Sequence, residues 1–403
     1  MKILICFIDM LRGKEELQNL KYKNMLKNIG GIYYSNAFAL SGDTFRSFST
    51  IITGLYPKEN GCTHSAYVPE TFLKNKMTIF NYLLNKNFKI YMKINPFFSN
   101  ISMFPRILNE CFLFNDIDEI IDNYKKDISK NKLFFYYDED YHELICNQSN
   151  KKQEIKARNK IIENLDYLFS KLNNKEFDKV IIFSDHGCTL YEDNEETNYN
   201  INDCRNKITL LVRENKNEEF CIKDHLVSTL DIFPTFLSWF KEPILKMRGK
   251  NVADTTYRKF YIEDGYCDYM GFDFGYKLLK RMYKIKIKST NTLDKIYTYK
   301  DLLKLEDEKE INFMNEYLVQ FSKIVTLEKI HKLIVEKKIY RLPNFKINME
   351  FFDSENRLQK YNDKTIIQKK DYYGRKSFYF KVISKISFIR KKYFNLLRVR
   401  END

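Results

Sequence analysis

The sequence is poor in glycine and proline and has no long apolar run, and each shortage excludes a class of protein. Its 403 residues include 12 glycines and 7 prolines, which excludes collagen-like and low-complexity chains. No run of about 18 uncharged apolar residues occurs, so no transmembrane helix is expected. Near the N-terminus the apolar residues 3–8 end at Asp9. This run is shorter than the roughly 7–15 apolar residues of an export signal, and a buried parallel strand is the better interpretation.

Paired cysteines are also missing. Eight cysteines are scattered along the chain, with no C-x-x-C pair among them. The spacing of a cysteine-rich zinc site is therefore absent. A chain of this length needs no disulfide framework to fold. We expect reduced thiols and a cytoplasmic protein.

The sequence does contain a globular mixture of residues with an uneven charge. Hydrophobic residues make up 44% and charged residues 30%, a mixture typical of folded domains. The length suggests two domains or more. The net charge is +14, and the last 40 residues carry +9 of it. A tail of this kind predicts a phosphate-bearing partner, either anionic lipid or nucleic acid.

Apolar strands alternate with helical patterns over the first 250 residues. We predict strands at residues 3–8, 88–92, 133–137, 179–183 and 208–212. We predict helices at residues 14–28, 77–87, 155–172 and 226–240. This alternation is typical of an α/β fold with a largely parallel sheet flanked by helices.

The pattern changes after about residue 250. Residues 259–263, 283–287 and 297–299 alternate as antiparallel strands do, and residues 316–336 have a helical pattern. We therefore predict a catalytic domain at 1–250, a smaller C-terminal α+β subdomain at 251–340 and a basic tail at 341–403.

Acidic residues follow two of the predicted strands. Asp9 follows KILICFI, and Asp185 with His186 follows VIIFS. Because ligands of open parallel sheets bind at the carboxyl ends of the strands, these side chains are candidates for holding a divalent cation. Two carboxylates and an imidazole suit zinc or manganese. The alternative is that each aspartate caps the helix that follows it.

Residues 41–61 carry the most specific motif. They read SGDTFRSFSTIITGLYPKENG, with Thr44 followed by T-G-L-Y-P and then by Gly61. Three other segments accompany this motif: IDMLR near the start, FSDHG at 183–187 and DHLVSTLDIFPTFL at 224–237. With these four blocks the sequence resembles the alkaline phosphatase/sulfatase superfamily. The four blocks occur in the family's order over residues 1–250. The resemblance implies an alkaline-phosphatase-like fold.

The resemblance also implies a set of site residues. Metal ligands would be Asp9, Thr44, Asp185 and His186, with zinc or manganese favoured over calcium or magnesium. Thr44 would be the nucleophile, since coordination to a metal stabilises its alkoxide. Arg46 would bind the oxygens of the transferred group through its planar guanidinium. The alternative for Arg46 is a solvated loop cation.

The nucleophile position departs from the sulfatase pattern. Sulfatases carry there a cysteine or serine that is oxidised to formylglycine, whereas this chain has Thr44. Threonine cannot give that aldehyde. Threonine nucleophiles occur in the superfamily's phosphodiesterases and phosphotransferases, so the resemblance favours phosphoester cleavage or transfer.

Further histidines and a lysine are weaker candidates. His142 is a candidate acid for the leaving group, and its spacing from Asp138 leaves a second metal site open. His64 and Lys93 are candidate substrate-binding residues. The alternative for each of them is a residue without a functional role, such as a surface residue. His225 is a poor candidate for a second metal site, and His331 lies in a basic helical pattern.

Residues 377–400 predict an amphipathic helix with basic and aromatic residues. With Arg375 and Lys376 the segment has nine basic and no acidic residues. This composition suits an anionic membrane surface. The alternatives are a helix packed on the body and, less favoured because no recognition module accompanies the charge, a nucleic-acid-binding segment.

The favoured function is a metal-dependent phosphoester hydrolase or phosphotransferase at the inner membrane face, acting on a glycan or lipid-linked phosphoester. The alternatives are a sulfuric ester hydrolase and a non-catalytic sulfatase-like binding protein. The residues do not separate water from a sugar hydroxyl as the final acceptor.

Overall fold

The structure of the chain is a computed structural model. It describes residues 1–13, 19–60, 77–94, 111–147, 150–190, 193, 202–242, 248–256 and 258–264, and four short strand segments, 284–289, 295–298, 349–352 and 358–361. By compactness the chain divides into two units. The first comprises Met1–Leu55, Met77–Ile262 and Ile287–Asp294, and the second comprises Tyr56–Lys76, Glu263–Lys286 and Lys295–Asp403.

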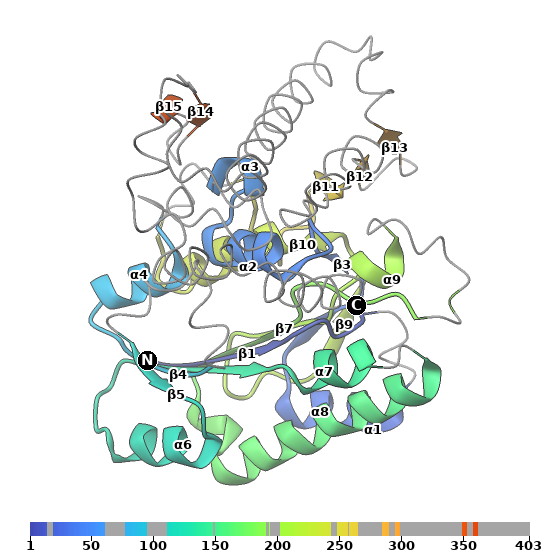
Figure 1. Ribbon diagram of the computed structural model, residues 1–403. Coiled ribbons are helices and arrows are strands. Elements are labelled where there is room, and N and C mark those ends of the chain that lie inside the picture. Colours follow the sequence, from blue (N-terminus) through green and yellow to red (C-terminus); the bar gives the residue numbers. More distant parts are fainter. Residues whose placement is uncertain are drawn as a thin grey trace, which may run out of the picture. The chain divides into compact units, whose positions relative to one another are not determined.

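An eight-stranded sheet forms the centre of the first unit (Figure 1). The strand order is β5-β4-β6-β1-β7-β8-β2-β9. The strands are β1 (Lys2–Ile8), β2 (Ile32–Tyr34), β4 (Lys89–Lys93), β5 (Phe112–Phe114), β6 (Lys132–Asp138), β7 (Lys179–Phe183), β8 (Leu210–Arg213) and β9 (Cys221–Lys223). The five strands from β5 to β7 run parallel. The predicted α/β fold with a largely parallel sheet is confirmed.

The central strand β1 aligns the carboxyl ends of three strands. In register, Ile8 lies opposite Asp138 of β6, and Phe7 lies opposite Phe183 of β7. All but the first of the seven residues of β1 are buried, as expected for a strand covered on both faces. The residues that follow β1, β6 and β7 therefore meet at one edge of the sheet.

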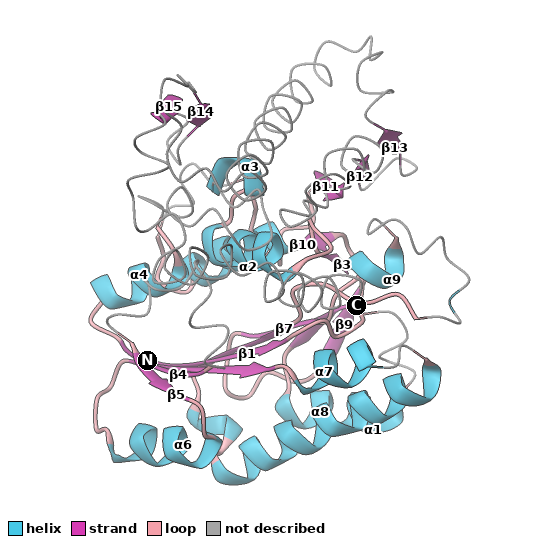
Figure 2. Cartoon of the chain, viewed as in Figure 1, coloured by secondary structure: helices cyan, strands magenta, loops and turns pink. Residues whose placement is uncertain are grey.

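Helices cover both faces of the sheet (Figure 2). On one side lie α1 (Leu20–Ile29), α6 (Ile117–Lys126), α7 (Asp140–Asn147) and α8 (Lys151–Lys171), and on the other lie α2 (Thr44–Thr53) and α4 (Ile79–Asn85). Helix α10 (Ile232–Ser238) packs against α2. Phe7 of β1 stacks on Phe48 of α2, with ring centroids 5.0 Å apart. Phe7 also stacks on Phe183 at 5.2 Å. These rings fix α2 against the strands that lead to Asp9 and Asp185.

The structure moves several predicted boundaries. The first helix begins at Leu20, not at residue 14, because Asn19 caps it by accepting a hydrogen bond from the backbone N–H of Tyr22. The predicted strand at 208–212 is β8, which runs antiparallel to β7. The predicted helix 226–240 is shorter, since β10 (Val227–Ser228) and a 3-10 turn (Thr229–Asp231) precede α10.

The C-terminal predictions are described only in part. Strands β11 (Lys259–Asp264), β12 (Lys284–Ser289) and β13 (Lys295–Thr298) occur at the three places predicted. The second unit contains α3 (Pro57–Asn60) and an antiparallel pair, β14 (Met349–Phe352) and β15 (Leu358–Tyr361). The predicted helices 316–336 and 377–400 lie outside the described residues, and the domain boundaries stay predictions. Among the described residues, no helix is long and apolar enough to span a bilayer.

Candidate metal and nucleophile site

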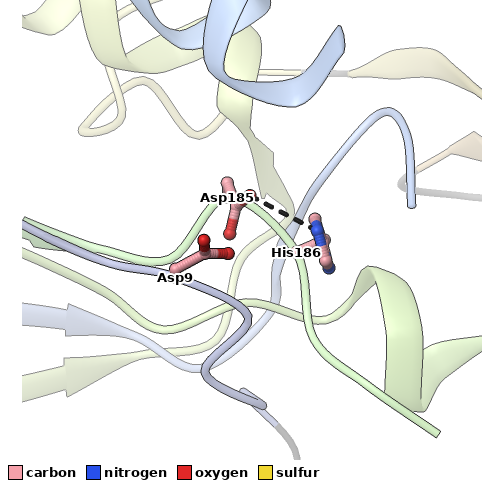
Figure 3. A group of neighbouring side chains, drawn as sticks. All are labelled: Asp9, Asp185 and His186. Atoms are coloured by element: carbon pink, nitrogen blue, oxygen red, sulfur yellow. Dashed lines mark ion pairs between the residues drawn. The ribbon is translucent and has the colours of Figure 1, made fainter. Parts of the chain in front are cut away.

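Asp9, Asp185 and His186 meet at the carboxyl edge of the sheet (Figure 3). Asp9 directly follows β1, and the other two follow β7. One ligand atom from each residue lies within 4.8 Å of the others, and all three side chains are buried. The parallel pairing of β1 with β7 causes this meeting of residues far apart in the sequence.

Hydrogen bonds hold the two carboxylates in place. The backbone N–H of Met10 donates to Asp185 Oδ1 at 3.0 Å, and the Tyr137 hydroxyl donates to Asp9 Oδ2 at 2.7 Å. Met10 has a positive φ of 63°, a conformation uncommon for a residue with a side chain. The turn after β1 thus aims a backbone donor at the neighbouring carboxylate.

The imidazole of His186 presents a lone pair to the site. Its Nδ1 lies 2.7 Å from the carbonyl oxygen of Gly187. A carbonyl only accepts, so Nδ1 carries the proton and Nε2 is unprotonated in the neutral ring. Burial lowers the pKa of His186 to about 4, against the opposing effect of Asp185. The ring is therefore neutral at physiological pH and suited to binding a metal through Nε2.

The arrangement lacks a positive charge at its centre. Asp185 Oδ2 is buried and accepts no hydrogen bond from the described residues. It lies 3.4 Å from the unprotonated Nε2 of His186, so two lone pairs face each other. Burial and the charge of Asp185 raise the pKa of Asp9 to about 7. A divalent cation bound by the three residues would satisfy Oδ2 and balance both carboxylates, so the residues fit the predicted metal.

Thr44 brings a hydroxyl to the same place. Its Oγ1 lies 3.4 Å from Asp9 Oδ1 and 3.3 Å from His186 Nε2. Both partners are acceptors, and one hydroxyl proton can satisfy only one of them. Thr44 is the first residue of α2, so the positive end of the helix dipole lies beside its oxygen. The four residues predicted to bind metal therefore converge, although their role stays a prediction.

Arg46 is engaged by its own helix. Its Nε pairs with Asp43 Oδ2, and its backbone N–H donates to Asp43 Oδ1 at 3.1 Å. Burial opposes ionisation of Asp43, but Arg46 outweighs this effect and lowers the pKa of the carboxyl group. Only 4% of Arg46 is exposed. These contacts support a role for Arg46 in fixing the start of α2, and direct binding of substrate by Arg46 stays a prediction.

His142 and Lys93 lie at the same edge of the sheet. His142, in α7, is half-buried, and its positive form would lower the pKa of Asp9 against the stronger effects of burial and Asp185. Lys93 ends β4, and its Nζ donates to the carbonyl oxygen of Tyr137 at 3.0 Å. Their assigned roles stay predictions, and His64 and His331 lie outside the described residues.

Two side chains named for a second metal have other partners. Asp138 accepts hydrogen bonds from the Tyr136 hydroxyl at 2.8 Å, from Asn164 at 2.9 Å and from the backbone of Asp140 at 3.0 Å. His225 Nε2 lies 2.6 Å from the carbonyl oxygen of Val252. Within the described ranges the group found that could hold a metal ion consists of Asp9, Asp185 and His186.

The sequence analysis missed Asp43 and Tyr137. Asp43 caps α2, and an aspartate directly before the first residue of a helical pattern is a recognisable N-cap signal. Tyr137 lies in the buried strand LFFYY, where one of two adjacent tyrosines reaches the site. Strand alternation separates the two faces, but the sequence does not say which tyrosine faces Asp9.

Comparisons with known proteins agree with the fold. No protein-family model matches the sequence, and no curated protein matches it significantly. Among solved structures, a phosphonate monoester hydrolase from Silicibacter pomeroyi aligns over 90% of this chain and 99% of its own, with 10% identity and a TM-score of 0.50. A protein assigned as a sulfatase, YidJ of Bacteroides fragilis, aligns over 82% and 97%, with 12% identity and a TM-score of 0.51. The chain has the alkaline-phosphatase-like fold of the alkaline phosphatase/sulfatase superfamily.

Proposed function

We propose that this chain is a metal-dependent enzyme that cleaves or transfers an anionic phosphoester through Thr44. The observation that carries the proposal is the position of the Thr44 hydroxyl, 3.4 Å from Asp9 Oδ1 and 3.3 Å from His186 Nε2. A hydroxyl beside two metal-binding groups and at a helix N-terminus is suited to attack an anionic centre.

Asp9, Asp185, His186 and Thr44 would hold the cation, with zinc or manganese favoured and calcium or magnesium as alternatives. When bound, the cation lowers the pKa of a hydroxyl and neutralises charge on the transferred group. Tyr137 holds Asp9 in the orientation that this requires, through its hydrogen bond to Oδ2. The backbone N–H of Met10 does the same for Asp185.

The reaction that we propose has two displacements. Thr44 Oγ1 loses its proton to water and forms a bond to phosphorus while the bond to the leaving oxygen breaks. His142 donates a proton to that leaving oxygen. Water or an acceptor hydroxyl then attacks phosphorus, the bond to Thr44 breaks, and the attacking group's proton returns to His142 while Thr44 regains a proton from water. The products are the hydrolysed or transferred phosphoryl group and the free alcohol.

A sulfuric ester hydrolase is the second candidate. The assignment of YidJ as a sulfatase, on a shared fold, favours it. Thr44 stands where sulfatases need a residue that can become formylglycine, which favours the phosphoester instead. A non-catalytic binding protein is the third candidate, and the convergence of Thr44 with Asp9 and His186 speaks against it.

The deciding experiment compares Thr44→Ala with Thr44→Ser on aryl phosphate diesters, aryl phosphonate monoesters and aryl sulfates. We expect turnover of a phosphorus ester that falls at least a thousandfold in Thr44→Ala, the order of loss for removing a catalytic nucleophile. Thr44→Ser keeps the hydroxyl and should keep part of the activity. Faster turnover of the sulfate would support the second candidate, and full activity of Thr44→Ala would refute the proposal.

Measuring the metal content of the purified protein distinguishes the proposed metal-dependent enzyme from the non-catalytic binding protein. Asp185→Asn keeps the shape of the side chain and removes its charge, so it should lose the cation while the fold stays intact. Elemental analysis of the purified wild type and of this variant measures the difference. Wild-type protein that stays free of metal after exposure to zinc and manganese, with its fold intact, would favour the non-catalytic candidate.

A further inference from the structure

Arg205 connects the two loops that carry the candidate nucleophile and the candidate metal ligands. It lies in α9 (Asp203–Asn206), between β7 and β8. Its carbonyl oxygen accepts a hydrogen bond of 2.7 Å from the backbone N–H of Gly187, the residue after His186. Its Nε donates to the carbonyl oxygen of Gly42 at 2.8 Å, two residues before Thr44. Both loops therefore hold Arg205 beside the site.

The outer end of the guanidinium remains available. Arg205 is half-buried, and within the described part of the chain no carboxylate pairs with it. A buried Nη atom of Arg205 without a hydrogen-bond partner would be an unsatisfied buried donor, and neither Nη atom is one. Both Nη atoms are therefore accessible to solvent. The hydrogen bond from Nε to the carbonyl oxygen of Gly42 restrains the plane of the guanidinium and does not involve the Nη atoms.

Five other described arginines have their side chains engaged by the fold. Carboxylates pair with four of them: Asp193 with Arg12, Asp43 with Arg46, Glu154 with Arg158 and Asp231 with Arg258. Arg213 donates to the backbone carbonyls of Ile29, Asn174 and Phe177. Arg205 differs from the first four because no carboxylate pairs with it, and from Arg213 because one hydrogen bond, from Nε, engages its side chain.

The charge of Arg205 lies near the site, because its hydrogen bonds join it to Gly187, the residue after His186, and to Gly42, two residues before Thr44. A positive charge there attracts an anionic substrate to the Thr44 hydroxyl. Arg46 cannot supply this attraction as readily, since Asp43 neutralises it.

We propose that Arg205 binds the non-bridging oxygens of the group transferred to Thr44. Two parallel N–H···O bonds from a planar guanidinium match the geometry of a phosphoryl or sulfuryl group, and a lysine cannot reproduce them. Arg205 thereby takes the substrate-binding role that the motif reading gave to Arg46. This inference rests on the proposed function, because it needs an anionic group to lie at Thr44.

The test measures binding of inorganic phosphate to zinc-loaded protein by calorimetry. We expect Arg205→Gln to weaken phosphate binding about ten- to a hundredfold, the effect of losing hydrogen bonds to a charged group. Arg205→Lys keeps the charge without the fork and should fall between this variant and the wild type. Zinc content and melting temperature should match the wild type in both variants.

Lys216→Gln is the matched control. It also removes one positive charge, but Lys216 pairs with Asp178 at the start of β7, the opposite end of the strand from the site. Phosphate binding should stay unchanged in Lys216→Gln. Unchanged binding in Arg205→Gln, an equal loss in the control, or absence of phosphate binding by the wild type would each overturn the inference.

The outcomes separate this inference from the proposed function. Turnover that survives in Thr44→Ala refutes the function, whatever Arg205→Gln does. Phosphate binding that survives in Arg205→Gln refutes the assignment of Arg205, while the loss of turnover in Thr44→Ala still supports the function. The two results come from different variants and different measurements.

Discussion

The carboxyl group of Asp9 makes the stability of the metal-free protein depend on pH. Burial and Asp185 raise its pKa from 3.8 to about 7. Because the folded state holds this proton more tightly than the unfolded chain, the contribution is present below about pH 4 and is lost as pH rises to about 7.

His186 acts in the opposite direction over part of this range. Burial lowers its pKa to about 4, so its contribution is present above about pH 6.5 and is lost as the pH falls toward 4. The two effects offset each other in the wild type. A variant that removes only the Asp9 carboxyl group or only the His186 imidazole is needed to measure the contribution of the other group to the pH dependence of stability.

Asp9→Asn isolates the effect of Asp9. In protein stripped with a chelator, we expect the melting temperature of Asp9→Asn to rise relative to that of the wild type between pH 4 and pH 7. Adding zinc should raise the melting temperature of the wild type near pH 7 and leave that of the variant nearly unchanged. A constant difference across this pH range would show that Asp9 does not bear the raised pKa.

Tyr136 and Tyr137 offer a matched pair of substitutions. The hydroxyl of Tyr137 donates to Asp9 at 2.7 Å, whereas that of Tyr136 donates to Asp138 at 2.8 Å. Each change to phenylalanine removes one buried hydrogen bond to a carboxylate. We expect zinc affinity to fall about ten- to a hundredfold in Tyr137→Phe only, the effect of losing a partner that orients a ligand. An equal fall in Tyr136→Phe would contradict this reading of the site.

The start of helix α2 sets the position of Thr44, the proposed nucleophile. Asp43 caps the helix and pairs with Arg46. Asp43→Ala removes both the cap and the charge and should lower the free energy of unfolding by about 1–3 kcal/mol. Asp43→Asn keeps the cap and removes the charge, so it should cost less. Chemical denaturation measures both, and equal losses would show that the cap contributes little.

Strands with a strong local signal could be predicted from the sequence. Features that depend on pairing between distant segments, such as the direction of a strand, could not. The buried strands around Asp9 and Asp185 follow from continuous apolar runs. The start of α1 was placed too early, although Asn19 is a cap signal. The antiparallel direction of β8 could not be predicted, since the order β1-β7-β8-β2 depends on pairing between distant segments.

At the scale of the whole molecule, the same limit applies to the site. Asp9, Asp185 and His186 could be grouped from the sequence because parallel strands end at one edge of a sheet. Arg205 could not, because no repeat or motif links it to Thr44. Its position depends on hydrogen bonds from α9 to the loops at Gly42 and Gly187, and these exist only in the folded chain.

The uneven distribution of charge along the chain predicts binding to an anionic membrane surface. The last 40 residues carry +9 of the total +14 and lie outside the described residues. We propose that residues 377–400 bind an anionic membrane surface, which would place the enzyme at the inner face of a membrane. Vesicles of neutral lipid should not sediment the protein, and vesicles with anionic lipid should, less strongly as salt increases.

Replacing Lys381 and Lys385 by glutamine tests this charge directly. At about 1 kcal/mol for each lysine, the double variant should bind anionic vesicles roughly thirtyfold more weakly. The control replaces Lys151 and Lys160, both about half exposed on the body, and should bind as the wild type does. Equal losses in both double variants would indicate attraction by net charge alone. Sedimentation with neither kind of vesicle would leave the tail to pack on the body or to bind nucleic acid, and would contradict a role at the membrane.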